Sequence, residues 1–204
     1  MPFPSVTLVA GDIGTGKTTF CNQFLCEGAR SGERGMFFVI FGGPTEWTHK
    51  FISTYEFVRP DYFEERIRYV DLGEAVEDAS VAGDVLRPME NALDGFKPRR
   101  VAIDNSIVLE DVLKDDYRRF LLKLSALLKS KGVAALITGE ACKDIPYPSR
   151  AAHVADGVIL LHNTEVNLVR RRSLEIVKMS GTSHLSGKHA VDISTRGLTV
   201  YPGL

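Results

Sequence analysis

The chain has 204 residues, of which 44% are hydrophobic and 25% are charged, as in ordinary globular proteins. Its 25 basic and 26 acidic side chains nearly cancel, which argues against a general electrostatic attraction to nucleic acid or to a membrane surface. No apolar run reaches membrane-spanning length, and the 3 cysteines show neither metal-ligand spacing nor a disulfide framework. Because the Met1–Pro4 start also lacks the basic region of a signal peptide, we expect a reduced, cytoplasmic protein.

The first predicted elements are a strand, a glycine-rich turn and a helix. Val6–Ala10 is apolar enough for a buried strand, and a helical pattern runs from Thr18 to about Ser31. The turn fits the phosphate-loop pattern G-x4-G-K-T, in which backbone N–H groups and the positive end of the helix dipole face an anion. In that pattern Lys17 neutralises the β- and γ-phosphates and the Thr18 hydroxyl holds Mg²⁺. The predicted phosphate-binding residues are Gly11, Asp12, Ile13, Gly14, Thr15, Gly16, Lys17, Thr18 and Thr19.

Two other interpretations of this turn fit less well. A purely structural turn would not require a strand before it and a helix after it, as the pattern has here. A dinucleotide fingerprint needs G-x-G-x-x-G, whereas these glycines are spaced G-x-x-G-x-G. We therefore expect a nucleoside triphosphate, and the lack of an Asn-Lys-x-Asp guanine motif favours ATP over GTP.

Strands and helices alternate from the loop to residue 140. This alternation predicts an α/β fold with a mostly parallel, doubly wound sheet. The expected strands cover residues 35–41, 67–72, 100–104 and 133–138. The expected helices run from Pro44 or Thr45 to Ile52, over residues 81–93, and, as the longest, from Asp115 and Asp116 to Gly132.

Strand signals follow one another without intervening helices after residue 140. They cover residues 157–162, 173–179, 190–194 and 198–201. We expect them to form an antiparallel extension at the edge of the sheet. Because no linker, repeat or low-complexity segment interrupts the sequence, residues 1–204 are predicted to form a single domain.

Asp104 is the candidate for a carboxylate beside the metal ion. It ends the apolar strand at residues 100–104, and phosphate-loop enzymes take such a carboxylate from a nearby strand. The alternative is that Asp104 caps the next helix, as aspartates at strand ends often do. Together with the loop, this position predicts Thr18 and Asp104 as the Mg²⁺ ligands.

The sequence resembles the KaiC-type branch of the RecA superfamily of ATPases. The most specific part of the resemblance is RRRSLEIVKMSGTSH at residues 170–184, followed by GLTVYP at residues 197–202. Shorter similar stretches are SKGV at 130–133, TGE at 138–140 and VADGV at 154–158. The resemblance implies a RecA-like fold, ATP with Mg²⁺, and often a ring in which Lys178 and His184 act on the nucleotide of an adjacent subunit.

The chain departs from this family at positions that bear on hydrolysis. Hydrolysing members end the second strand in two glutamates that polarise water, whereas Gly42 and Gly43 stand here. The family's Lys-x-Arg-Gly becomes KMSG at residues 178–181, so a cation is also missing. Because phosphoryl transfer depends on oriented water and charge stabilisation, we expect nucleotide binding with weak or no hydrolysis. Glu46 is the candidate for a relocated base, with a first-turn helix residue as the alternative, and Glu140 is the other nearby carboxylate.

Several other features have simpler interpretations than function. The basic triplet at residues 170–172 is a weak nucleic-acid patch and is expected on a solvated hairpin. Residues 106–116 are apolar and acidic, and residues 142–150 carry only two cations, so DNA binding is disfavoured. Cys21 and Cys26 fall inside the first helix, where packing explains them. The apolar run at residues 107–109 is expected to meet a neighbouring subunit.

The sequence thus predicts a RecA-like, ATP·Mg²⁺-binding regulatory or assembly protein with an unknown protein partner. The proposed catalytic residues are Lys17, Glu46, Asp104 and Lys178, and the homo-oligomeric ring would place Lys178 in trans. One alternative is an active ATPase that uses Glu46 as its base. Another is a recombinase-like DNA-binding ATPase. A small-molecule kinase is disfavoured, because the sequence shows no arginine-rich lid.

Overall fold

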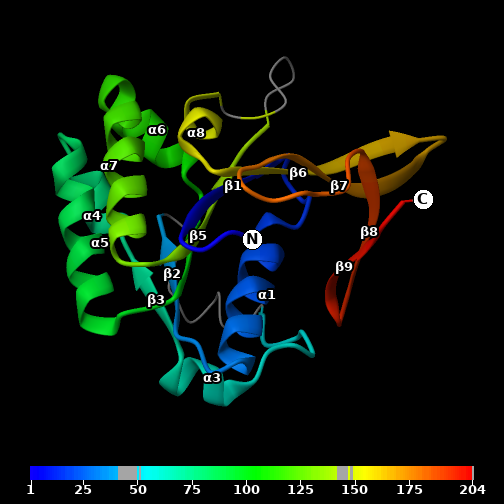
Figure 1. Cartoon of the computed structure of the whole chain (residues 1–204), viewed down its shortest axis with the longest axis horizontal. Helices are drawn as coiled ribbons and strands as arrows, with labels where there is room; N and C mark the ends of the chain where they lie inside the picture. The colour runs from blue at the N-terminus through cyan, green and yellow to red at the C-terminus, as the bar shows by residue number, and fades with distance from the viewer. Residues whose placement is uncertain (41–49, 51, 142–146, 148, 204) are drawn as a thin grey trace.

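A single β-sheet runs through the molecule. The computed structural model describes residues 1–40, 50, 52–141, 147 and 149–203, and within them the sheet has 9 strands in the order β3-β2-β4-β5-β1-β6-β7-β8-β9 (Figure 1). The strands are β1 Ser5–Gly11, β2 Gly35–Val39, β3 Ile67–Asp71, β4 Arg100–Asp104, β5 Ala134–Gly139, β6 Gly157–Val166, β7 Val169–Met179, β8 Lys188–Ser194 and β9 Gly197–Tyr201.

Helices cover both faces of the parallel part of this sheet (Figure 1). The helices are α1 Lys17–Arg30, α3 Pro60–Glu65, α4 Gly73–Glu77, α5 Ala82–Phe96, α6 Ile107–Leu113, α7 Tyr117–Ser130 and α8 Ser149–Val154. One core lies between the sheet and α5 and α7, and the other lies between the sheet and α1. Leu8 and Val9 of β1 point into opposite cores, as the two-residue period of a strand requires. This is the doubly wound α/β arrangement that the alternation of elements predicts.

The change from parallel to antiparallel pairing comes one strand later than expected. β6 pairs in parallel with β1, with Gly11 opposite Leu161, and only β7, β8 and β9 continue antiparallel. The reason is α8, a helix of 6 residues that precedes β6 and lets the chain enter the sheet in the parallel direction. The antiparallel C-terminal extension is therefore confirmed, but residues 157–162 belong to the parallel sheet.

The helix bounds show three further differences. α5 is the longest of the described helices with 15 residues, against 14 for α7, and Asp115 and Asp116 lie in a 3-10 turn before α7. The short helices α3, α4, α6 and α8 were not predicted, because 5 to 7 residues show too little periodicity. The helix expected from Pro44 or Thr45 lies outside the described residues, apart from Lys50 and Ile52.

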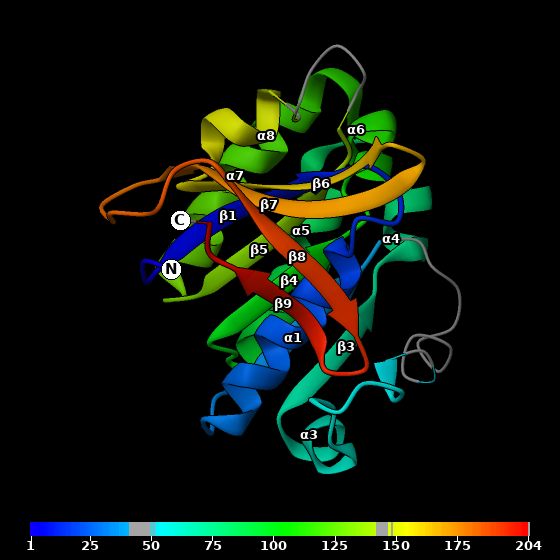
Figure 2. The ribbon, with the colours of Figure 1, turned by 90° about the vertical axis from the view of Figure 1, so that its right-hand side faces the viewer.

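The C-terminal hairpin β8–β9 folds back over α1 (Figure 2). The Gln23 side chain of α1 accepts a hydrogen bond from the backbone N–H of Leu198 at 2.8 Å and donates one to its carbonyl at 3.2 Å. At the start of α1, a Cβ on Gly16 would lie 2.6 Å from the Cδ1 of Ile193 in β8. The hairpin therefore holds the half of α1 that adjoins the glycine-rich loop.

Cys21 and Cys26 lie on the buried side of α1. Burial raises the pKa of the Cys26 thiol to about 12 and raises the pKa of the Cys21 thiol well above its usual range. Both thiols stay protonated near neutral pH and pack in the core between α1 and the sheet, as the sequence predicts.

Candidate nucleotide-binding site

The loop between β1 and α1 has a backbone that requires its glycines. Gly14 and Gly16 have φ angles of 76° and 99°, in the left-handed region that side chains disfavour. A Cβ on Gly11 would lie 2.3 Å from the carbonyl oxygen of Leu161 in β6, so that position has no room for a side chain. Inside the loop, Thr15 donates a hydrogen bond from its hydroxyl to the Asp12 carbonyl at 2.8 Å. The sequence pattern thus produces a curled backbone that leads directly into the first turn of α1.

The Lys17 ammonium lies across this loop. Its Nζ donates to the carbonyl oxygens of Gly11 at 2.7 Å and Asp12 at 3.0 Å. Partial burial lowers the pKa of Lys17, while the negative charges of Glu140, Asp104 and Asp12 act in the opposite direction. The side chain is therefore a positioned cation whose partners in this structure are neutral carbonyls, which an anion can replace.

Asp104 ends β4 directly opposite the start of α1. Its carboxylate accepts the Thr18 hydroxyl at 2.7 Å on one oxygen, and on the other the Thr138 hydroxyl at 2.6 Å and the Asn105 N–H at 3.0 Å. The N-cap of α6 is Ser106, so the Asp104 carboxylate serves these three donors rather than that helix end. The structure thus brings Thr18 and Asp104 together, as the sequence predicts.

A cavity of about 320 Å³ opens between the loop and the carboxyl ends of β4 and β5. Among the described residues that line it, Lys17 supplies an ammonium, and Asp104 and Glu140 supply carboxylates. Ile13 is 84% exposed at its rim. Its lining residues are Ile13, Gly14, Lys17, Thr18, Asp104, Asn105, Ser106, Ile107, Thr138, Gly139 and Glu140.

The donor set of this cavity fits a magnesium ion that is shared with a phosphate. Among the described residues no cluster of three or more His, Cys, Asp or Glu side chains forms a metal cage. Mg²⁺ is usually held by only one or two protein oxygens together with water and substrate phosphates. The Thr18 hydroxyl and the Asp104 carboxylate, in contact at the edge of the cavity, are oxygen ligands of that kind.

The structure places the other predicted residues away from this cavity or leaves them undescribed. Lys178 lies on β7 opposite Val158, and its Nζ donates to the Ala155 carbonyl of its own chain at 2.7 Å. His184 is exposed in the segment between β7 and β8. Glu46, together with the adjacent residues 42 and 43, lies outside the described residues.

Thr138 and Ser106 contribute to the site without having been predicted to do so. The Thr138 hydroxyl donates to Asp104 and accepts the Asn105 N–H at 2.9 Å, and the Ser106 hydroxyl donates to the Thr138 carbonyl. The available signal was the position of Thr138 at the end of an apolar strand next to the Asp104 strand. The run at residues 107–109, expected to face another subunit, instead turns Leu109 into the core and Ile107 toward the cavity.

Comparison with known proteins agrees with this geometry. A family model described as "ATPase: KaiC" matches residues 1–204, the whole chain. The chain belongs to the KaiC-like ATPase family. Its membership implies nucleotide binding, and its sheet with antiparallel C-terminal strands is the RecA-type fold of that family.

Three similar proteins show how the family extends. The circadian clock protein KaiC3 of Synechocystis is 29% identical over 215 residues, covering 99% of this chain and 42% of KaiC3. The UPF0273 protein PH0284 of Pyrococcus horikoshii is 27% identical over 222 residues, covering 99% of this chain and 87% of that protein. The crystal structure of the KaiC-like protein PH0186, also from Pyrococcus horikoshii, superposes with a TM-score of 0.85 at 29% identity, covering 99% of this chain and 91% of that one.

The chain spans about two fifths of the length of the KaiC relatives that it matches. In the part of this KaiC-like chain that the structure describes, every helix is too short or too polar to cross a lipid bilayer.

Proposed function

We propose that this KaiC-like chain binds ATP with Mg²⁺ and hydrolyses it slowly or not at all, so that the bound nucleotide controls a protein assembly. The observation that carries the proposal is the 2.7 Å contact between the Thr18 hydroxyl and the Asp104 carboxylate, beside Lys17 in the cavity. A hydroxyl, a carboxylate and an ammonium in this arrangement are what a Mg²⁺–triphosphate needs.

The proposed binding roles follow from the contacts of each residue. The backbone from Gly11 to Thr19 cradles the phosphates, and Lys17 exchanges its two carbonyl partners for phosphate oxygens. Thr18 holds the metal ion and Asp104 holds it through water, while Thr138 keeps the Asp104 carboxylate oriented. When bound, Mg²⁺ supplies positive charge to the β- and γ-phosphates.

Weak hydrolysis is proposed from the carboxylates that surround the cavity. Asp104 is engaged by three hydrogen-bond donors, so it is a poor base for an attacking water. The sequence has Gly42 and Gly43 where its resemblance to KaiC-type ATPases implies glutamates in hydrolysing members, and Ser180 where it implies an arginine. Without a water-orienting carboxylate and a second cation, binding is retained and turnover falls.

An active ATPase is the second candidate, and one observation favours it. Glu140 lines the cavity, and its charge acts on the pKa of Lys17, so a carboxylate does face the site. In this version Glu140, or Glu46 as a relocated base, orients the water.

The assembly is proposed to be a homo-oligomeric ring that also recruits a protein partner. Lys178 does not line the cavity of its own chain, so its action on a nucleotide requires a neighbouring subunit and release of the Ala155 carbonyl. All nine described strands lie in one sheet, which supports residues 1–204 acting as one nucleotide-binding unit. The cytoplasmic location that the sequence predicts is part of the same proposal. DNA binding by a recombinase-like ATPase is the weaker alternative, since Arg170 already pairs with Glu165 on its hairpin.

The test combines binding, phosphate release and mass on the same sample. A fluorescent ATP analogue is titrated with and without Mg²⁺ into the wild type, Lys17→Ala and Asp104→Asn, and steady-state phosphate release is followed in parallel. We expect Mg²⁺-dependent binding that Lys17→Ala weakens more than tenfold, slow phosphate release, and an ATP-dependent change of mass.

Variants of the candidate carboxylates separate the two functions. If the chain turns over slowly because glutamates are missing, the double variant Gly42→Glu, Gly43→Glu accelerates phosphate release. Rapid turnover by the wild type that is lost in Glu140→Gln or Glu46→Gln establishes the active ATPase instead. An affinity for the ATP analogue that is the same without Mg²⁺ and the same in Lys17→Ala refutes the nucleotide site itself.

A further inference from the structure

A second cavity, of about 330 Å³, lies at the amino ends of β4 and β5, whereas the nucleotide site lies at their carboxyl ends. β4 runs from one cavity to the other, because Arg100 at its amino end borders this cavity and Asp104 at its carboxyl end borders the nucleotide cavity. Four residues of extended chain separate them by about 13 Å. We call the second cavity the arginine cavity, and the charged side chains in its lining are those of Glu33, Arg99 and Arg100.

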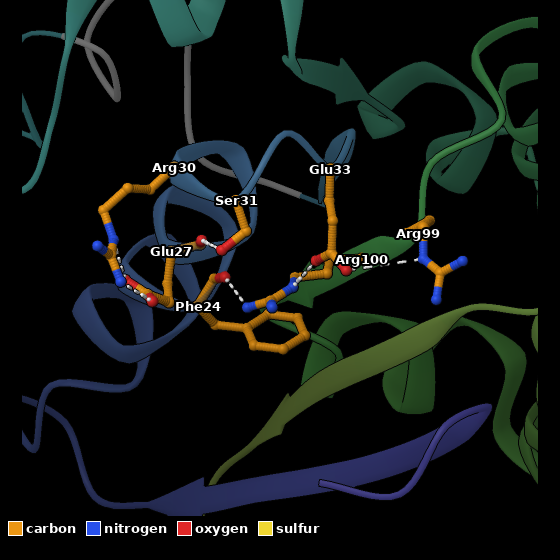
Figure 3. A network of polar contacts seen from close by, with 7 residues as sticks. All are labelled: Phe24, Glu27, Arg30, Ser31, Glu33, Arg99 and Arg100. Atoms are coloured by element: carbon orange, nitrogen blue, oxygen red, sulfur yellow. Dashed lines mark hydrogen bonds and ion pairs between the residues drawn. The ribbon is translucent and has the colours of Figure 1, made fainter.

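Arg100 is fixed in the wall of the arginine cavity (Figure 3). Its Nε donates to Glu33 at 2.6 Å, and its Nη1 donates to the carbonyl of Phe24 in α1 at 2.9 Å. Its guanidinium also lies over the Phe24 ring, 4.9 Å from the centroid. Three different groups therefore hold this cation in one orientation, which makes it a rigid part of the wall.

Arg99 supplies a second cation that is held less completely. Its Nε lies 3.7 Å from Glu33, and its guanidinium lies 4.3 Å from the centroid of the Phe3 ring. In the described part of the chain, the two terminal nitrogens of Arg99 have no hydrogen-bond partner, and Figure 3 shows them pointing away from Glu33. Two cations thus share one carboxylate, so the cavity has an excess positive charge and a free guanidinium fork.

The space that this cluster occupies depends on a glycine in α1. A Cβ on Gly28 would lie 2.6 Å from the Cδ of Arg100 and 2.7 Å from its Nε. Glycine inside a helix costs about 1 kcal/mol relative to alanine. The chain nevertheless carries Gly28 here, in a buried position in the last turns of α1, where it admits the Arg100 side chain.

The arginine cavity also has apolar residues in its lining. The rings of Phe3 and Phe24 face it, together with Met1, and Ala134 at the start of β5 completes the lining. Aromatic and guanidinium planes both stack on flat rings, and the fork of an arginine matches a carboxylate or phosphate with two parallel hydrogen bonds. The volume is within the range of small-molecule pockets.

From this combination we infer that the arginine cavity is a binding site for a small planar organic anion. The ring of the ligand stacks against these aromatic–guanidinium pairs, and its acidic group is bound by the terminal nitrogens of Arg99. An aromatic carboxylate and a nucleoside monophosphate share this chemistry. The inference does not depend on the proposed function, because none of the residues of the arginine cavity lines the nucleotide cavity.

The experiment uses the full chain and two probes, salicylate and AMP, observed by saturation-transfer NMR and titrated to roughly 10 mM. The test variants are Arg99→Ala, which removes the fork, and Phe3→Ala, which removes one stacking plane. Both residues are about half exposed, Arg99 at 57% and Phe3 at 48%, so the fold should persist. The matched control is Arg30→Ala, because Arg30 is an exposed arginine of the same region whose partner is Glu27 (Figure 3). Thermal melting of every variant verifies that it is folded.

We expect at least one probe to bind the wild type, with an affinity that falls about tenfold in Arg99→Ala, falls in Phe3→Ala, and stays unchanged in Arg30→Ala. If only the binding of salicylate depends on Arg99, the ligand is an aromatic carboxylate. If the binding of AMP depends on Arg99, the ligand is a nucleotide. AMP bound at the phosphate loop is recognised because it does not respond to Arg99→Ala. The inference is overturned if neither probe shows Arg99-dependent binding, or if Arg30→Ala weakens binding as much as Arg99→Ala.

Discussion

Replacing Thr138 by valine tests whether its hydroxyl organises the nucleotide site. Valine has the same shape but removes the donor to Asp104 at 2.6 Å and the acceptor for the Asn105 N–H at 2.9 Å. A hydrogen bond to a charged group contributes about 1.5–3 kcal/mol and a neutral one about 1 kcal/mol. Asp104 is half-buried and Asn105 keeps its bond to the Asp104 carboxylate, so we take the low end and expect a loss of about 2 kcal/mol.

The assay is urea unfolding of the ligand-free protein, followed by titration of nucleotide with Mg²⁺. Thr138→Ser is the control, because it keeps the hydroxyl and removes only a buried methyl group, which costs about 1 kcal/mol. Thr138→Val should be the less stable of the two variants and should also need more Mg²⁺ for nucleotide binding. Equal or smaller destabilisation by valine than by serine would show that the hydroxyl does not orient Asp104.

Three further predictions address the loop, the core and the C-terminal hairpin. Gly14→Ala causes only backbone strain, because the space around it is open, whereas the new Cβ in Gly16→Ala would also lie 2.6 Å from Ile193. The melting temperature should therefore fall further for Gly16→Ala. The pKa of the Cys26 thiol rises from 9.0 to about 12 on folding, so its contribution to the free energy of unfolding should be constant below pH 9 and fall by up to about 1.4 kcal/mol per pH unit above it. Cys26→Ala should therefore reduce the alkaline slope of stability in urea unfolding. Gln23→Ala removes both hydrogen bonds to Leu198, and hydrogen exchange of the β8–β9 amides should accelerate more than that of β1.

The features that could be predicted from sequence are those with a local cause. Gly14 and Gly16 have positive φ angles because the turn requires that backbone conformation, so the spacing of these glycines predicts the loop. Asp104 stands where an apolar strand ends, and parallel strands bring such ends to one edge of the sheet. Both signals are contained in a few consecutive residues.

The features that could not be predicted depend on distant parts of the chain. Thr138 resembles any strand-terminal threonine until β5 is placed beside β4, where its hydroxyl reaches Asp104. The contact of Lys178 with Ala155 depends on the irregular register between β6 and β7 near Val158. Likewise, the parallel pairing of β6 follows from α8, a helix too short for a periodic signal. In each case the sequence shows which residue or strand is present, but its contacts depend on strand pairing between distant parts of the chain.

The position of α1 connects the phosphate loop with the C-terminal hairpin of the sheet. α1 begins at Lys17 and lies between the central strands and the β8–β9 hairpin, which contacts it near Gly16 and Gln23 (Figure 2). The turn of that hairpin is joined in turn to Glu56 by hydrogen bonds through Thr195. Because packed interiors transmit strain, a shift of the loop on binding a phosphate would reach the hairpin through these contacts. The C-terminal hairpin therefore lies in direct contact with the helix that the phosphate loop begins, far from it in sequence and adjacent to it in the fold.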